Sequence, residues 1–375
     1  MKQKFILVIN AGSSSLKFKL FKEDLSDVAS GIVEKIGAKG SFIDFKFKKT
    51  SEKRVLTIKN HDQAIEAVID VLHENKIDFS QIVKVGHRVV HGGEKFVKPA
   101  VVNAKFLKEI VQFNKLAPLH NPNNIAGIKA CLKLLPNAKS YAVFDTAFHA
   151  SIPDYAFLYP LPYKMYTKHK VRRYGFHGTS HQYVSLVAAK KLKKVKPNFI
   201  TCHLGSGCSI TAIRDGLSVD TSMGFTPLEG LMMSTRSGDI DPAIIFYLKR
   251  EGMTESQIDR LLNFESGLKG VSGMKDMRDI MIANGYKIPG YKSPVKFTKE
   301  QKYLAKVALQ MFVYRVRKYI GAYTAVIGDV DAIVFTAGVG ERNKDVRDLI
   351  VKNLKHKPKV MVIPTNEEYM IAALI

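Results

Sequence analysis

Residues 10 to 17, Asn-Ala-Gly-Ser-Ser-Ser-Leu-Lys, separate two apolar runs with a turn built almost wholly of small residues. The preceding run, 5–9, is continuously apolar and is typical of a fully buried strand, whereas residues 16–21 alternate as a half-buried strand does. Gly12 permits backbone geometry closed to other residues, the serines supply hydroxyls beside backbone N–H groups, and Lys17 adds a cation. The sequence therefore predicts a β-hairpin whose tip can hold a polyphosphate, and a hairpin with a solvated serine tip is the simpler alternative.

The same pattern returns near residue 199. The apolar run 199–204 is followed by Gly-Ser-Gly-Cys-Ser at 205–209 and then by a second strand-like run. Aligning residues 11–15 with 205–209 matches apolar runs on both sides, which favours a duplicated domain with one phosphate-binding hairpin in each half. A chance match between two glycine turns is the alternative. With 375 residues the chain also exceeds the usual size of one hydrophobic core, so two domains are expected.

Strand-like and helix-like segments alternate through the rest of the chain. Apolar residues at helical spacing predict helices over residues 62–73, 124–135 and 304–327, and short apolar runs predict strands over residues 82–85, 141–144 and 332–335. Asp145 directly follows one of these strands, and a glycine-containing loop at 336–341 precedes a helix expected to start near Lys344. The alternation predicts an α/β fold with functional side chains at strand ends.

The composition is that of an ordinary globular protein with a strongly basic balance. There are 58 lysine and arginine residues against 34 aspartate and glutamate residues, a formal net charge of +24. The lysines are scattered, and the densest run, 190–196, has no interleaved aromatic residues, so a solvated surface is favoured over a nucleic acid or membrane partner. Three cysteines without metal-ligand spacing indicate a reducing cytoplasm. The apolar run that stops at Asn10 is expected to be a strand rather than a signal peptide.

Six motifs of this chain resemble those of the acetate kinase family and occur in the same order. They are NAGSSSLK at 10–17, GHRVVHGG at 86–93, DTAFH at 145–149, RYGFHGTSH at 173–181, TRSGDIDP at 235–242 and TNEE at 365–368. Several of these motifs are long and unusual, and the resemblance extends over residues 4–372, nearly the whole chain.

The resemblance implies an α/β fold of two duplicated actin-like (ribonuclease H-like) domains with the active site in the cleft between them. The N-terminal domain would span 1–148, with the tail 368–375 returning to it, and the C-terminal domain, 149–367, would bind the nucleotide and form a homodimer. The implied reaction is reversible transfer of a phosphoryl group from ATP to acetate, giving acetyl phosphate and ADP, with magnesium or manganese. The implied location is the cytoplasm, without a nucleic acid or membrane partner.

The arginine and histidine residues of these motifs suit that reaction. Phosphoryl transfer depends on positioning and on neutralising charge at the phosphate oxygens. By resemblance, Arg88 would hold the acetate carboxylate and Arg236 the transferring phosphoryl group, both from glycine-flanked, loop-like settings. His177 would stabilise the transition state. Asp145 belongs to the family's catalytic set, but ionised acetate needs no general base, so positioning or electrostatics is favoured over proton transfer.

The resemblance also assigns the binding residues. The acetate methyl group would contact Val90, Leu119, Phe176 and Pro227, with His120 close by. The metal would contact Asn10 and Glu367. The nucleotide would contact Ser13, Ser15, Lys17, His203, Leu204, Gly205, Ser206, Gly207, Asp276, Met277, Arg278, Gly338, Val339, Gly340, Glu341 and Arg342.

Simpler interpretations exist for many of these residues. Apolar residues are usually core, an arginine at a domain boundary is often in a salt bridge, and Glu367 with Glu368 could be an acidic pair at a helix start. His120 and His203 could be core or capping histidines.

Alternative functions also remain open on the sequence. Ser206 and Arg342 stand where the family commonly has asparagine, and Arg342 bears on contact with the nucleotide base rather than on phosphoryl transfer. A propionate or butyrate kinase is the near alternative function. A non-catalytic ATP-binding module is the distant one, but it would have no reason to keep Arg88, His177 and Arg236.

Overall fold

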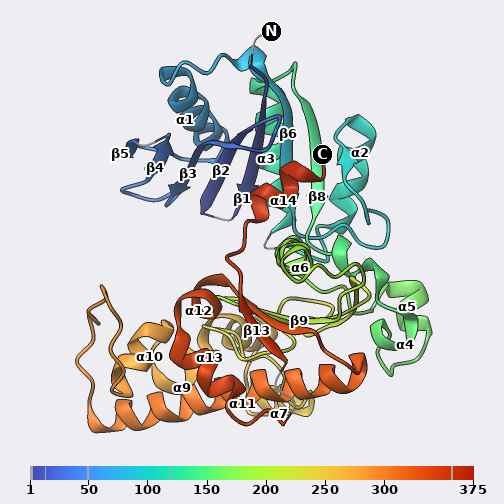
Figure 1. Cartoon of the computed structure of the whole chain (residues 1–375), viewed down its shortest axis with the longest axis vertical. Coiled ribbons are helices and arrows are strands. Elements are labelled where there is room, and N and C mark those ends of the chain that lie inside the picture. Colours follow the sequence, from blue (N-terminus) through green and yellow to red (C-terminus); the bar gives the residue numbers. More distant parts are fainter. Residues whose placement is uncertain (1–2, 13, 49, 119, 356–357) are drawn as a thin grey trace. The chain divides into compact units, whose positions relative to one another are not determined.

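The chain folds into two compact units, each built around its own mixed β-sheet (Figure 1). The computed structural model describes residues 3–12, 14–48, 50–118, 120–355 and 358–375. Unit 1 comprises residues 1–150, 178–180 and 366–375, and unit 2 comprises residues 151–177 and 181–365.

The sheet of unit 1 has the strand order β5-β4-β3-β2-β1-β6-β8-β7. Its strands are β1 (Phe5–Ala11), β2 (Ser15–Lys22), β3 (Asp27–Glu34), β4 (Phe42–Phe47), β5 (Thr50–Val55), β6 (Ile82–Val89), β7 (Ala100–Val101) and β8 (Lys139–Phe144). Strands β1 and β2 form the predicted antiparallel hairpin, in which Asn10 pairs with Lys17, and the backbone N–H of Gly12 donates to the Ser15 carbonyl (2.7 Å). The prediction of a hairpin is confirmed.

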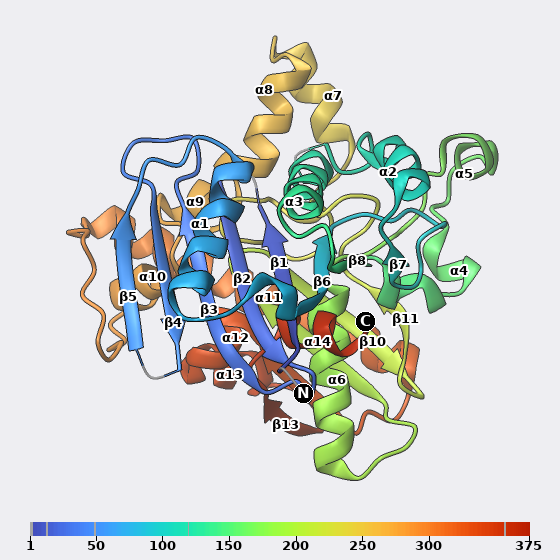
Figure 2. The same ribbon diagram turned by 90° about the horizontal axis from the view of Figure 1, so that it is seen from above.

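Strand β1 is apolar throughout because both faces of the sheet are covered. Its odd-numbered residues, Leu7 among them, pack in a core with α1, whereas Ile6 and Val8 pack against Ile371 of the last helix. Helix α1 begins after Asn60, whose side chain accepts the Gln63 N–H, and it lies over the face of β2 and β3 in Figure 2. The helices of unit 1 are α1 (His61–Glu74), α2 (Ala104–Ile110), α3 (Asn121–Leu134) and α14 (Glu367–Ala373), with short 3₁₀ turns at Phe79–Gln81, Val111–Phe113 and Ala147–Ser151.

The sheet of unit 2 repeats the core of unit 1. Its strands are β9 (Phe199–Leu204), β10 (Cys208–Arg214), β11 (Leu217–Thr221), β12 (Ala332–Thr336) and β13 (Lys359–Val362), in the order β11-β10-β9-β12-β13. In both units the first strand is antiparallel to the second and parallel to its other neighbour, β6 in unit 1 and β12 in unit 2, so this order matches β3-β2-β1-β6-β8 strand for strand. The shared topology confirms the predicted duplicated α/β fold.

The helices of unit 2 surround this second sheet. They are α4 (Asp154–Phe157), α5 (Lys164–His169), α6 (Gly178–Leu192), α7 (Ala243–Arg250), α8 (Glu255–Arg260), α9 (Gly267–Ser272), α10 (Met277–Ala283), α11 (Lys299–Ile327), α12 (Ala337–Arg342) and α13 (Lys344–Val351), with a π-helical turn at Leu261–Glu265. The first three residues of α6 group with unit 1. Helix α11 begins with a capping box between Thr298 and Gln301 and packs against β10, which confirms the predicted long amphipathic helix.

Two predictions of local structure are wrong. Arg88 is not in a loop, because β6 continues through it to Val89, held by β8 on one side and, up to His87, by β1 on the other. Residues 336–341 are not a loop either, since helix α12 starts at Ala337. Ala337 has a positive φ of 63°, which turns the chain sharply out of β12, and Glu341 Oε1 accepts its N–H (2.8 Å).

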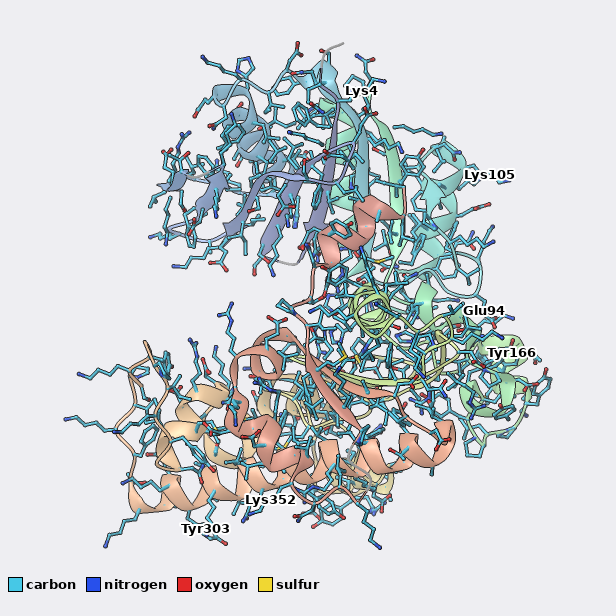
Figure 3. All side chains as sticks on the ribbon, in the orientation of Figure 1. Lys4, Glu94, Lys105, Tyr166, Tyr303 and Lys352 are labelled. Carbon is cyan, nitrogen blue, oxygen red and sulfur yellow. The ribbon has the colours of Figure 1, made fainter. Side chains whose placement is uncertain are left out.

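Both units carry exposed basic side chains. Lys4 and Lys105 are exposed on unit 1 and Lys352 on unit 2 (Figure 3). Of the helices that the structure describes, none combines the length and the apolar character needed to cross a membrane.

We expect the substitution Ile371→Ala to weaken unit 1 by about 2–4 kcal/mol, because Ile371 is fully buried against β1 and its loss leaves a cavity. Chemical denaturation measures this free energy of unfolding. Val55→Ala, at a side chain that is 74% exposed, is the control and should change it by less than about 0.5 kcal/mol. Equal effects of the two substitutions would show that α14 does not anchor to the sheet.

Candidate active site

Unit 1 gathers four of the predicted site residues around one guanidinium group. Arg88 Nε donates to Asp145 Oδ1 (3.0 Å), and Arg88 Nη2 also pairs with the Asp145 carboxylate. Arg88 Nη1 donates to Asn10 Oδ1 (3.1 Å), and Glu367 Oε2 lies 3.7 Å from Arg88 Nε. The Asp145 side chain is 1% exposed, so this is a largely desolvated ion cluster.

The topology of the sheet explains why these residues meet. Asn10 is near the end of β1, Arg88 near the end of β6, and Asp145 directly follows β8, and these three strands are parallel neighbours. The carboxyl ends of parallel strands lie at one edge of a sheet, where α/β proteins usually place their ligands. Gly178 also comes very close, since a Cβ there would lie 2.1 Å from the Asp145 carbonyl oxygen, and only glycine fits.

The ionised form of Glu367 is destabilised within this cluster. Burial raises its pKa to about 7, and the nearby carboxylates Asp145 and Glu368 add to the increase, while Arg88 and Lys17 oppose it. Burial alone would lower the pKa of Arg88, but Asp145 and Glu367 more than offset that effect and raise it. The cluster therefore contains more negative charge than its two cations neutralise.

This excess of negative charge fits a divalent cation. Magnesium takes oxygen ligands and keeps several waters, so one or two protein groups are sufficient. Asn10 and Glu367 supply an amide and a carboxylate oxygen of that kind. Among the residues that the structure describes, no group of three or more histidine, cysteine, aspartate or glutamate side chains forms a closed metal cage.

Unit 2 holds a chain of hydrogen-bonded histidines beside its glycine loop. His177 Nδ1 lies 2.9 Å from Ser209 Oγ, and His181 Nε2 lies 2.7 Å from the same oxygen. His181 Nδ1 in turn contacts Thr201 Oγ1 (2.7 Å). His203 stacks on the His177 ring, with centroids 4.2 Å apart. His177 itself has a left-handed backbone (φ 56°), a strained conformation that often accompanies function.

Arg236 lies on the other side of the same loop. A Cβ on Gly207 would be 3.4 Å from the His177 ring and 3.7 Å from Arg236 Nη1, so the glycine lies between the two side chains. Arg236 Nη1 donates to the Pro227 carbonyl (3.3 Å), and no carboxylate pairs with it in the part of the chain that the structure describes. Burial lowers the pKa of Arg236. A largely buried guanidinium without an acidic partner has the charge and the planar N–H groups that suit an anion.

The predicted site residues divide between the two units. Unit 1 holds Asn10, Ser15, Lys17, Arg88, Val90, His120, Asp145 and Glu367, and unit 2 holds Phe176, His177, the loop 203–207, Pro227, Arg236, 276–278 and 338–342. Val90 and Phe176 are buried, as expected of pocket or core residues. Ser13 and Leu119 lie outside the described residues.

Several predicted nucleotide contacts have local structural roles. Asp276 caps α10 by accepting the Arg278 N–H (2.9 Å) and also pairs with the Arg278 side chain, which lies over the Tyr291 ring. Glu341 accepts the backbone N–H groups of Ala337 and Thr365. Arg342 is exposed.

Four further residues of the site, His181 among them, were not predicted. Ser209 and Thr201 hydrogen bond to the histidines, and Thr179 Oγ1 donates to Asp145 (3.2 Å). His181 had a signal in the sequence, because its spacing of four residues from His177 places both on one side of a helix start. Ser209 is the last residue of the repeated loop at 205–209, and this position could have identified it as a candidate site residue.

An unpaired arginine and a histidine beside a glycine loop, together with an arginine–carboxylate cluster at strand ends of a duplicated α/β fold, define a phosphotransferase. The model of the acetokinase family matches residues 5–358. Acetate kinase of Thermoanaerobacter pseudethanolicus is 47% identical over an alignment of 401 positions that covers 98% of this chain and 97% of the relative, and that of Clostridium novyi is 45% identical over 400 positions, covering 98% and 96%. The chain belongs to the acetokinase family.

Solved structures of the same family share the fold. A propionate kinase from Francisella tularensis is 41% identical with a TM-score of 0.90, and the acetate kinase of Porphyromonas gingivalis is 40% identical with a TM-score of 0.88. Each comparison covers 99% of this chain and 98% of the other.

We expect Glu367→Gln to stabilise the protein at pH 8 but not at pH 5 when divalent cations are chelated. The folded pKa of Glu367, about 7, exceeds the unfolded value near 4.3, so the folded state binds more protons and wild-type stability falls as pH rises through this window. The difference at pH 8 should be on the order of 2 kcal/mol, because the charge is partly solvated. Thermal and urea unfolding at both pH values measure it.

Glu66→Gln, at an exposed position of α1, is the matched control and should show no such pH dependence. A pH-independent effect of Glu367→Gln would contradict the assigned shift.

We expect Ser209→Ala to lower kcat by about 10- to 100-fold, since it removes the oxygen shared by two histidines and frees His177 to turn. Ser222→Ala is the control, because Ser222 is equally buried and its hydroxyl accepts the backbone N–H of Ile210 (2.9 Å) rather than bonding to a histidine. Both variants should lose stability, but only the first should lose turnover. Equal values of kcat would exclude a role for Ser209 in holding His177.

Proposed function

We propose that this protein catalyses the reversible transfer of the γ-phosphoryl group of ATP to acetate, giving acetyl phosphate and ADP. Full-length similarity to acetate kinases supports the reaction class. The observation that carries the proposal is Arg236, a desolvated guanidinium with no carboxylate partner in the described chain, lying across Gly207 from His177. A protein that only bound nucleotide would not need to leave this charge uncompensated.

The cluster of unit 1 is proposed to bind acetate. Asp145 and Asn10 occupy three N–H groups of Arg88, and each terminal nitrogen of Arg88 retains one more N–H for an incoming carboxylate. Asp145 therefore positions Arg88. It is not needed as a proton acceptor, because acetate is ionised at neutral pH and attacks without a general base.

The groups of unit 2 are proposed to stabilise the transferring phosphoryl group. An acetate oxygen forms a bond to the γ-phosphorus as the bond to the β–γ bridging oxygen breaks, and ADP leaves with that electron pair. Arg236 and His177 donate hydrogen bonds to the equatorial oxygens, where charge develops. Hydrogen bonding to Ser209 fixes which way the His177 ring points.

Magnesium, or manganese in its place, would be held by Asn10 and Glu367 and would neutralise charge on the ATP phosphates. The remaining phosphate contacts are proposed to come from the hairpin tip with Ser13, Ser15 and Lys17, and from the loop 203–207. Residues 276–278 and 338–342 are proposed to contact the nucleoside, where the exposed Arg342 would influence base preference.

Propionate is a second candidate acceptor, favoured by the similarity to the Francisella propionate kinase. The proposed methyl pocket consists of Val90, Leu119, Phe176 and Pro227. One additional methylene group changes transfer free energy by about 0.8 kcal/mol, which is roughly a fourfold effect, so acetate and propionate are expected to differ only modestly.

Three broader expectations also remain proposals. Residues 1–148 with the tail 368–375 would form the N-terminal actin-like domain, and the C-terminal domain, 149–367, would bind the nucleotide and form a homodimer. The three cysteines are free and buried, which suits a reducing cytoplasm.

The test is to incubate the protein with Mg-ATP and acetate, propionate or butyrate and to trap acyl phosphate with hydroxylamine. We expect hydroxamate from acetate, and Arg236→Ala should lower kcat by about 10³-fold or more. Arg250→Ala, which removes an exposed arginine of the same unit, should leave kcat unchanged. Absence of hydroxamate with all three acids would overturn the proposed function.

A further inference from the structure

The segment that carries Arg236 is closed at its base by one residue. Asp239 Oδ1 accepts the backbone N–H of Gly230 (2.7 Å), and the backbone N–H of Asp239 donates to the Gly230 carbonyl (2.9 Å). These two bonds join the ends of residues 230–239 into a loop, which we call the Arg236 loop. Gly230 has a φ of 105°, and a Cβ there would lie 2.5 Å from the Ser222 carbonyl, so no other residue fits this closure.

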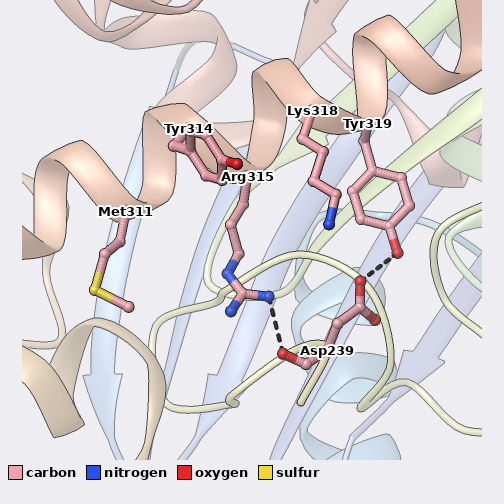
Figure 4. A pocket seen from close by; sticks show the side chains of 6 residues that line it. All are labelled: Asp239, Met311, Tyr314, Arg315, Lys318 and Tyr319. Carbon is pink, nitrogen blue, oxygen red and sulfur yellow. Dashed lines mark hydrogen bonds between the residues drawn. The ribbon is translucent and has the colours of Figure 1, made fainter. Parts of the chain in front are cut away.

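Helix α11 holds this base from outside the loop (Figure 4). Tyr319 Oη donates to Asp239 Oδ2 (2.7 Å), and Arg315 Nη1 donates to the Asp239 carbonyl (2.8 Å). Both carboxylate oxygens and the carbonyl of Asp239 are thus engaged. Burial and the bond to Asp239 raise the pKa of Tyr319, so its phenol stays protonated and remains a donor.

Arg315 and Tyr319 lie on one side of α11, and the opposite side of this helix packs in the hydrophobic core. Phe312, Val316 and Ile320 of α11 are buried, whereas Met311, Tyr314, Arg315, Lys318 and Tyr319 line a cavity of about 220 Å³ that Asp239 closes. The spacing of these residues places them on one face of α11. A helix of 29 residues packed along its length is a rigid support for a loop.

Arg236 depends on the loop for its direction. Among the described residues, its side chain makes a 3.3 Å bond to the Pro227 carbonyl and a 3.9 Å contact with Met233 Sδ, both weak. The tip of the loop is held by backbone bonds, among them Ser234 N–H to the Ser206 carbonyl (3.1 Å) and Ser266 N–H to the Thr235 carbonyl (3.0 Å). The base, three residues after Arg236, is held by the hydrogen bonds of Asp239, and between the two residues the Ser237 N–H donates to the Leu262 carbonyl (3.0 Å).

We propose that Tyr319 and Arg315 are positioning residues for phosphoryl transfer, which act by fixing Asp239 and thereby the backbone from which Arg236 reaches the phosphoryl group. The proposal rests on the proposed function of Arg236. Both side chains would act through Asp239 rather than by contact with substrate. Their effect is on the orientation of a charge that works only in the transition state, so they should alter kcat more than the KM values for ATP and acetate.

The cavity supplies matched controls for both residues. Tyr314 lies five residues before Tyr319 on α11, is 65% exposed, and makes no hydrogen bond to Asp239. Lys318 lines the same cavity as Arg315 and carries the same charge, but it forms no ion pair among the described residues. Tyr319→Phe is therefore compared with Tyr314→Phe, and Arg315→Met with Lys318→Met.

Tyr319→Phe should lower kcat about tenfold with KM changed less than twofold, because a small displacement of a catalytic group is costly. Arg315→Met should show the same pattern, and the two controls should keep wild-type kcat. In an Arg236→Ala background Tyr319→Phe should lower the residual rate less than twofold, since the group it positions is gone. Circular dichroism and thermal unfolding establish that each variant is folded.

The outcomes separate this proposal from the proposed function. If Arg236→Ala keeps full activity, the role of Arg236 is wrong. If Arg236→Ala is inactive but Tyr319→Phe and Arg315→Met match their controls, the positioning role is wrong while the proposed function stands. If Tyr319→Phe lowers the rate equally with and without Arg236, its effect is a general structural one, and the positioning role is again excluded.

Discussion

Burying a guanidinium group costs free energy unless negative charge lies close to it. Arg88 and Arg236 differ in how this cost is met. Arg88 pairs with two carboxylates of the chain, those of Asp145 and Glu367. Arg236 has no such partner among the described residues, although burial lowers its pKa. An incoming anion would offset the desolvation cost of Arg236. Arg88 is fixed in place by its partners within the chain, whereas the side chain of Arg236 is not.

The duplicated sheet explains why each unit presents polar groups at comparable places. In both units the first strand ends in a tight turn of small residues and pairs with the second strand, and a parallel strand, β6 in unit 1 and β12 in unit 2, ends beside it. The first unit places Asn10 and Arg88 at this edge, and the second places His203 and the start of α12. The two units therefore share one sheet topology but carry different functional groups, an oxygen-rich cluster in unit 1 and a nitrogen-rich cluster in unit 2.

Much of this arrangement could be predicted from the sequence, and the exceptions have physical causes. The hairpins, the helix α1 and the long helix α11 follow from local periodicity, which the tertiary structure does not override. Arg88 was predicted in a loop because Gly86 interrupts the apolar run, but pairing with strands on both sides keeps β6 extended. Residues 336–341 were predicted as a loop, but a positive φ at Ala337 starts a helix there, and no local pattern encodes that conformation.

The bonds that link distant parts of the chain were not predictable, since no sequence pattern connects Asp239 with Tyr319 or His177 with Ser209. What the motifs did indicate was the sign of the charges. Asp145, Glu367 and Glu368 outnumber Arg88 and Lys17 around the first cluster, whereas Arg236 stands without a carboxylate in the second. A cation suits the first set and an anion the second, and a magnesium-bound polyphosphate carries both. The scattered charge of +24 is not needed for this discrimination, because two local imbalances of opposite sign are sufficient.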